Sequence, residues 1–163
     1  MNSLLHKYES GVCDETWVYF KIELGEYDPD FASDILKLRP NDFQRKGRIV
    51  HSSLTGRKRI QEYNSWCLKT DDIIHSPVLN DHLTWVLEYL KGKNSELKYL
   101  QNLEGVTMYI RCVWWSRCGE GGPTIEPSIL QTLADMNIEL HFSLMNLSFS
   151  FPDSNFTNED DSI

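Results

Sequence analysis

The sequence lacks long apolar runs and paired cysteines. None of its segments approaches a membrane span, and the opening MNSLLHKYESG has no signal-peptide core. Its four cysteines, Cys13, Cys67, Cys112 and Cys118, include no C-x-x-C pair. We therefore expect a cytoplasmic protein with free and mostly buried thiols.

Basic residues are also scarce. The chain has 16 Lys and Arg against 24 Asp and Glu, a net charge of -8 over 163 residues. Six of the cations lie between residues 45 and 59, which leaves 10 basic against 24 acidic residues elsewhere. Such a balance disfavours nucleic-acid binding, which depends on neutralised phosphates, and suits a cationic protein partner.

Catalytic and metal-binding motifs are missing as well. The chain contains no G-x-S-x-G, no H-E-x-x-H and no Gly-Lys-Ser/Thr loop ending. Cys112 and Cys118 have no further ligands at zinc spacing, and Glu120 and Glu126 would repel a phosphate from the glycine-rich connection. His82 lies on the apolar stripe of a helix, as a core residue does. We predict no metal, no cofactor and no catalytic residues; a catalytic site assembled from distant segments stays an open alternative.

Three segments alternate apolar with other residues at the period of a β-strand. In residues 17–24 the apolar positions are Val18, Phe20, Ile22 and Leu24, and residues 106–115 and 138–144 repeat the pattern. Each is predicted to be a strand with one buried face. Residues 48–54 and 59–70 flank a turn at Gly56 and are predicted to form a hairpin.

Helical signals occur in four other segments. Asp28 is suited to cap a short helix that begins at Pro29 and that Pro40 ends, and Pro127 begins another at 126–137. Residues 76–93 and 95–103 have apolar residues at helical spacing.

These elements predict one α+β domain over residues 1–150. An antiparallel or mixed sheet would be covered by helices on one side. Residues 17–36 and 107–134 both run from a strand to a proline-started helix, a pattern that favours two related strand-helix units. Residues 151–163 are expected to form an acidic, flexible tail.

Several short motifs carry a family resemblance over residues 15–145. They are the strand ending at Gly25, DPD at 28–30, Pro40, KG at 46–47, SW at 65–66, and the helix carrying His82 and Leu83. With these features the chain resembles the bacterial family catalogued as domain of unknown function 4279. Proteins of this kind often lie beside toxin genes, so the resemblance is compatible with an immunity role.

Aromatic residues suggest where a partner binds. Trp17, Tyr19 and Trp115 fall on the strand faces opposite the buried ones, and Arg117 and Glu120 follow at the strand end. Exposed aromatic residues commonly anchor protein partners, so we predict these five as partner-binding residues. In the alternative, helices cover both sheet faces, or the rings pack against the long connection.

The basic hairpin offers a second hypothesis. Arg57, Lys58 and Arg59 lie beside Tyr63 and Trp66, a combination that can meet phosphates and stack a base. Trp66 also alternates with Leu68, which favours a core position instead. Our first hypothesis is a non-enzymatic immunity protein that occludes the active site of a cognate, cationic toxin. The alternative is a nucleic-acid or nucleotide binding module that uses residues 45–59.

Overall fold

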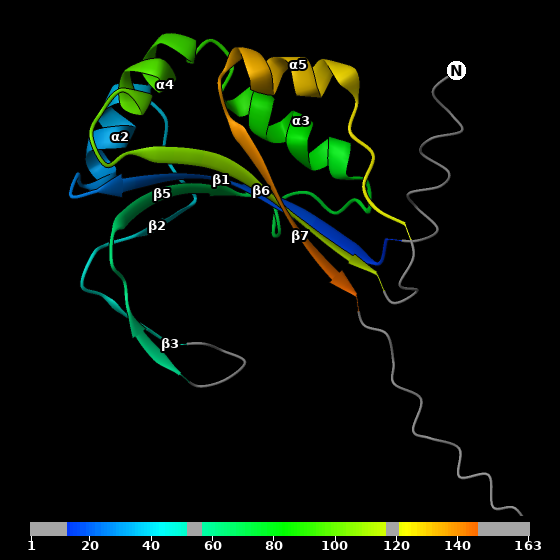
Figure 1. Ribbon diagram of the computed structural model, residues 1–163, viewed down its shortest axis with the longest axis horizontal. Helices are drawn as coiled ribbons and strands as arrows, with labels where there is room; N and C mark the ends of the chain where they lie inside the picture. Colours follow the sequence, from blue (N-terminus) through cyan, green and yellow to red (C-terminus); the bar gives the residue numbers. More distant parts are fainter. Residues whose placement is uncertain (1–12, 52–56, 117–120, 147–163) are drawn as a thin grey trace, which may run out of the picture.

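The computed structural model describes residues 13–51, 57–116 and 121–146. Five strands form one sheet in the order β2-β5-β1-β6-β7, in which only β6 and β7 run parallel (Figure 1). The strands are β1 (Glu15–Gly25), β2 (Asp42–Gln44), β5 (Asn64–Lys69), β6 (Thr107–Ser116) and β7 (Glu139–Asn146). A separate hairpin consists of β3 (Ile49–His51) and β4 (Lys58–Ile60).

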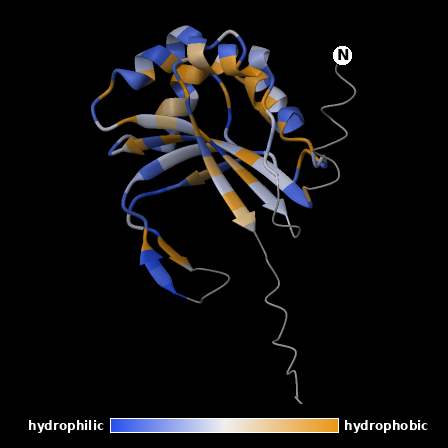
Figure 2. Ribbon diagram, turned by 45° about the vertical axis from the view of Figure 1, so that its right-hand side comes forward, coloured by the Kyte–Doolittle hydropathy of each residue, from blue (hydrophilic) through white to orange (hydrophobic). Residues whose placement is uncertain are grey.

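The helices all lie on one face of the sheet, and the hairpin projects on the other side (Figure 1). They are α2 (Pro29–Leu36), α3 (Leu79–Tyr89), α4 (Asn94–Gln101) and α5 (Pro127–Asp135). Apolar segments gather between the helices and the sheet (Figure 2). The predicted α+β domain with a mixed sheet and one helix-covered face is confirmed. The predicted tail at 151–163 lies outside the described residues.

The central strand β1 shows how the alternating pattern forms the core. Val18, Phe20, Ile22 and Leu24 have no exposed surface, and all four belong to the core cluster under the helices. Phe20 meets the Trp66 ring edge-to-face at a centroid distance of 6.1 Å. The buried side predicted for this strand, and the core position of Trp66, are confirmed.

Two strand-helix units flank the centre of the sheet, as predicted. Pro29 and Pro127 both begin their helices, which follow β1 and β6. After α5 the chain returns as β7 directly beside β6, whereas β5 separates β2 from β1. Strand β5 therefore lies between β1 and β2 in the sheet, although it follows both of them in the chain.

Two element boundaries differ from the predictions. The arm at 59–70 is not one hairpin strand, because Trp66 and Leu68 are buried under the helices and draw β5 into the main sheet. The first helix ends at Leu36 and not at Pro40, because Lys37 takes a left-handed conformation with φ 54°.

The apolar side of the last strand is also less buried than its alternation predicts. Phe142 and Leu144 are 44% and 59% exposed. The C-terminal half of β7 runs beyond the helices that would cover it (Figure 1). The alternating pattern therefore predicts the strand, but it does not predict how much of the strand the helices cover.

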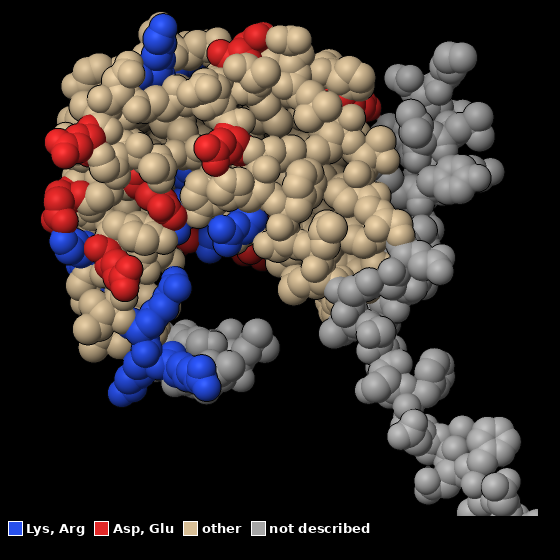
Figure 3. Space-filling model, viewed as in Figure 1, with Lys and Arg blue, Asp and Glu red and all other residues tan. Residues whose placement is uncertain are grey.

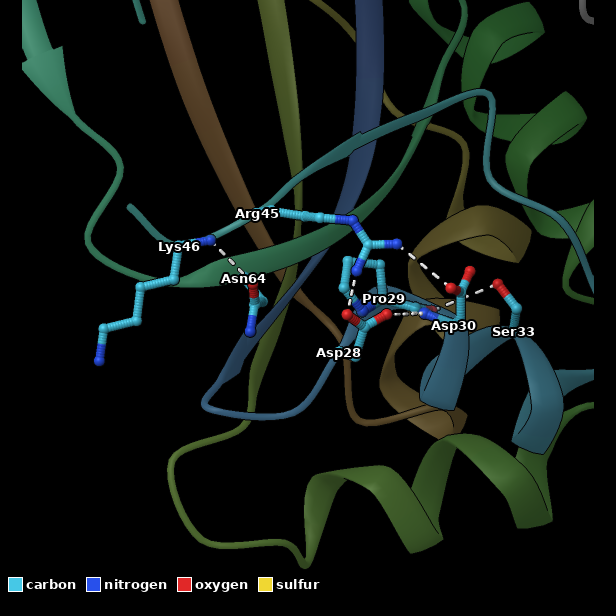
Figure 4. A network of polar contacts seen from close by, with 7 residues as sticks. All are labelled: Asp28, Pro29, Asp30, Ser33, Arg45, Lys46 and Asn64. Atoms are coloured by element: carbon cyan, nitrogen blue, oxygen red, sulfur yellow. Dashed lines mark hydrogen bonds and ion pairs between the residues drawn. The ribbon is translucent and has the colours of Figure 1, made fainter. Parts of the chain in front are cut away.

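A polar network fixes the start of α2 to the segment after β2 (Figure 4). Asp28 caps the helix by accepting a hydrogen bond of 2.9 Å from the Asp30 amide. Arg45 donates to the carboxylates of Asp28 and Asp30, and the Lys46 amide donates to Asn64 Oδ1 at 2.8 Å. The network explains why the DPD and KG motifs lie close together in space.

A second network is largely buried between β1, the end of β5 and α3. Thr70 Oγ1 accepts from the Val18 amide at 2.9 Å and contacts His82 Nδ1 at 2.7 Å. His82 Nε2 lies 2.9 Å from the carbonyl oxygen of Ser76, to which it can donate. Burial lowers the pKa of His82, and the Ser76 hydrogen bond only partly offsets this. The histidine is therefore a satisfied core residue, as predicted.

Candidate functional site

A cleft of about 360 Å³ opens on the sheet face that no helix covers. Its floor is formed by side chains of β1, β5 and β6, and Arg59 and Tyr63 line it from the hairpin side. Tyr19 pairs with Arg111, and Lys21 pairs with Tyr109, in the antiparallel register of β1 and β6. Alternation therefore sends all four of these side chains to the same open face.

Charges of both signs line the cleft. Four residues are basic and three are acidic: Lys21, Arg59, Lys69 and Arg111 against Glu23, Asp42 and Asp71. Figure 3 shows basic side chains in the hollow between the sheet and the hairpin. The acidic excess of the chain therefore lies outside this cleft.

Arg111 occupies the middle of the floor among aromatic rings. Its guanidinium carbon is 5.9 Å from the centroid of Tyr19 and 5.4 Å from that of Tyr109. Burial lowers the pKa of Arg111, but interactions with the Tyr19 hydroxyl outweigh burial and the pKa is raised overall. The ring of Tyr109 also stacks against the ring of His141, with centroids 4.5 Å apart.

Lys21 and Glu23 form a second polar group on the same floor. Lys21 Nζ lies 3.5 Å from Glu23 Oε1 and 3.4 Å from Tyr63 Oη. Tyr109 donates its hydroxyl to Glu23 at 3.1 Å. Burial, followed by the charge of Glu23, raises the pKa of Tyr109, so this phenol keeps its proton and remains a donor.

The third polar group lies where β5 meets β2. Lys69 Nζ pairs with Asp42 at 2.7 Å. Burial lowers the pKa of Lys69, but the Asp42 carboxylate outweighs it and the pKa is raised overall. Burial, and then Asp42, raise the pKa of the Cys67 thiol to about 12. At neutral pH this thiol holds its proton and is a weak nucleophile.

Gln44 adds an unusual feature to the cleft wall. Its Oε1 is buried and accepts no hydrogen bond from the residues that the structure describes. Leaving a buried acceptor unpaired costs about 1–3 kcal/mol. Such a cost on a polar face is typical of a site retained for binding rather than for stability.

The structure brings some of the predicted partner-binding residues together. Trp17 and Tyr19 line the cleft, and Trp115 lies on the same sheet face opposite Glu15. All three are half-buried rather than fully exposed. Arg117 and Glu120 lie outside the described residues.

The predicted anion-binding residues are divided instead. Arg59 lines the cleft, and in β4 alternation turns Lys58 to the opposite side of the hairpin. Arg57 is exposed just before the strand. Trp66 is buried under the helices and so lies away from the hairpin cations.

Sequence reasoning missed Arg111, Lys21 and Tyr109 as the centre of the site. The signal was present, because each alternates with buried residues of β1 or β6 and must share a face with Trp17 or Trp115. Which strands lie adjacent was the missing information, since β1 and β6 are far apart in the chain.

Comparison with protein families gives one match. A model described as a domain of unknown function (DUF4279) matches residues 14–147. The chain belongs to this family. The resemblance carried by its short motifs is confirmed, and the matched range includes the whole described sheet. Comparisons with curated proteins and with solved structures found no match.

Within the described ranges, none of the helices has the length and apolar character needed to cross a membrane. Nor do these residues contain a cluster of three or more His, Cys, Asp or Glu side chains placed to hold a metal ion.

Proposed function

We propose that the protein is a non-enzymatic immunity protein that neutralises a cognate bacterial toxin by binding it on the open face of the sheet. The observation that carries the proposal is the cleft, where half-buried Trp17 and Tyr19 adjoin charged groups. Aromatic residues and arginine supply most of the binding energy in protein interfaces. The toxin-gene neighbourhood of the family adds to this support.

Charge supports the kind of partner proposed. The chain has a net charge of -8, and the cleft contains more basic than acidic groups. The net negative charge of the chain would attract a cationic toxin over long distances, and the mixed charges in the cleft would fix its orientation. Occlusion needs no chemistry from this chain, only a contact that covers the active site of the toxin.

Co-expression with the product of the adjacent gene tests the proposal. The protein should restore growth of cells that produce that toxin, and the purified pair should form a complex. Replacing Trp17 with alanine should weaken the complex by about 30-fold, the effect of losing about 2 kcal/mol at a hot spot.

Tyr99→Ala is the matched control, because Tyr99 is 50% exposed on α4, on the helix side. It should leave affinity and growth unchanged. If Tyr99→Ala abolishes protection while folded Trp17→Ala protects fully, the contact lies on the helices and the proposed face is wrong. An adjacent product that neither harms cells nor binds the protein would contradict the immunity role itself.

A further inference from the structure

Arg111 makes no salt bridge with any of the described residues. Its guanidinium contacts Tyr19 and Tyr109, and the charge of Glu23 on the same floor also favours the charged form of Arg111. Cation–π contacts of this kind contribute about 0.5–2 kcal/mol. None of these contacts supplies the two oxygen atoms that the planar guanidinium binds best.

Two of the three carboxylates that line the cleft are already engaged. Glu23 holds Lys21 and accepts from Tyr109, and Asp42 pairs with Lys69 at 2.7 Å. The third, Asp71, makes no salt bridge with Arg111 in the described ranges, and Glu139 on the neighbouring strand lies 2.9 Å from His141 Nε2. The position beside Arg111 can therefore accept an anion from outside the chain.

A planar surface lies next to this charge. Trp17 is half-buried in the cleft and, among the described side chains, no aromatic ring stacks on it. It pairs with Val113, so Trp17 and Arg111 are diagonal neighbours on one face. Diagonal neighbours on a sheet are about 7–8 Å apart and can contact one small ligand together.

We propose that the cleft binds a small molecule that carries a carboxylate or a phosphate on a flat ring. Arg111 binds the oxyanion, since its planar fork matches two oxygen atoms, and Trp17 stacks on the ring. Arg59 adds a second positive charge from the hairpin side. The cleft volume of about 360 Å³ lies within the range of small-molecule sites.

The ligand proposal does not rest on the proposed toxin contact, although both use Trp17 and the same cleft. It can be tested on the purified protein alone, and it places the anion at Arg111 on the sheet floor, with Arg59 as a second cation. Ligand binding and toxin binding can therefore fail separately, and each has its own measurement.

Titration calorimetry of the full chain with four probes tests the proposal. Benzoate and phenyl phosphate each combine a ring with an oxyanion, benzyl alcohol has the ring without the charge, and inorganic phosphate has the charge without the ring. Benzoate or phenyl phosphate should bind saturably at one site, at least 10-fold more tightly than the other two probes. Added salt should weaken this binding. The better of the two identifies the oxyanion.

Variants locate the bound molecule. Arg111→Gln should weaken binding of the better probe by at least 10-fold, and Trp17→Leu should weaken it through loss of stacking. Arg39→Gln makes the same change of charge at an exposed residue outside the cleft and should have no effect. Circular dichroism checks that each variant is folded. If Arg111→Gln is not folded, Arg111→Lys is used in its place. Lysine keeps the positive charge but lacks the planar group that binds two oxygen atoms.

The proposal is overturned if neither ring-bearing anion binds at millimolar concentration. It is equally overturned if a folded Arg111 variant binds as tightly as the parent protein. Inorganic phosphate that binds as tightly as phenyl phosphate would overturn the role of the ring.

Discussion

Successive residues of β1 point to opposite faces of the sheet, one covered by helices and one open. Phe20 and Ile22 have no exposed surface beneath the helices, whereas Tyr19 and Lys21 face the open cleft. The helix-covered face combines apolar packing with satisfied hydrogen bonds, as at Thr70 and His82. Among the described residues, the open face instead keeps an arginine without a salt bridge and a buried acceptor without a hydrogen bond. We therefore expect stability to depend mainly on the first face, and we propose that the second face serves binding.

The largest expected effect comes from breaking the covered face. Phe20→Ala should lower the free energy of unfolding by about 3–5 kcal/mol, because it removes a fully buried ring and leaves a cavity against Trp66. Urea unfolding followed by circular dichroism measures the loss. Tyr19→Ala, one residue earlier on the open face, should cost clearly less; equal losses would contradict the division between the faces.

The buried polar network should give the next largest effect. Thr70→Val keeps the size of the side chain but removes the oxygen that serves the Val18 amide and His82. We expect a loss of about 1–3 kcal/mol, the cost of unsatisfied buried groups. Thr70→Ser retains the hydroxyl and should lose less. A valine variant as stable as the parent in urea would show that the network contributes nothing.

The same network should make stability depend on pH. The pKa of folded His82 lies below its ordinary value of 6.5, so the unfolded chain takes up this proton more readily. The contribution to stability is complete above pH 6.5 and is lost as the pH falls from 6.5 through the folded pKa. Urea midpoints measured between pH 8 and pH 5 should show this loss. In a folded His82→Gln variant the loss should shrink, and an unchanged pH profile would assign it to other groups.

Changes at the start of α2, near the β2 edge of the sheet, should lower the free energy of unfolding by less. Asp28→Ala removes the cap of α2 and the contact with Arg45, and should cost about 1 kcal/mol. Asp28→Asn keeps a capping oxygen, so the difference between the two variants in thermal unfolding isolates the ion pair. Because Arg45 and Asp28 are 44% and 51% exposed, we expect that difference to be the smaller part.

The smallest effect is expected for a cation of the open face. Arg59→Gln should change the free energy of unfolding by no more than about 0.5 kcal/mol, because Arg59 is exposed and supports no core contact. Denaturant unfolding provides the measurement. A loss above 2 kcal/mol would show that the hairpin cation holds the fold together, contrary to the proposed role of this face.

The sequence predicts which residues of a strand share a face better than it predicts which strands lie side by side. Period-two alternation in residues 17–24 correctly separates buried from open positions, because a strand with one covered face must alternate. In residues 106–115 it identifies the helix-covered face, but Tyr109 and Val113 on the other face are buried too. Pro29 and Pro127 mark the helix starts because proline fits the first helical turn. The break between β4 and β5 at residues 61–63 depends on tertiary packing. The end of α2 at Leu36 depends on the left-handed conformation of Lys37. Local sequence patterns indicate neither of them.

The candidate site was predictable only in part for the same reason. Trp17, Tyr19 and Trp115 could be assigned to the open side from their own strands. The pairing of Tyr19 with Arg111 and the stacking of Tyr109 on His141 depend on the strand order, and strand order is set by packing between distant segments.

The pairing of β1 with β6 also has a consequence during synthesis on the ribosome. The hydrogen bond from Thr16 Oγ1 to the Val113 carbonyl joins residues 97 positions apart. At ~5–20 residues per second, the ~80 residues between the two strands take roughly 4–16 s to emerge. Until then the central strand of the sheet keeps an unpaired edge beside an apolar face, which is the form most prone to aggregate. Nascent chains stalled before residue 107 should therefore bind chaperones more strongly than released full-length chains.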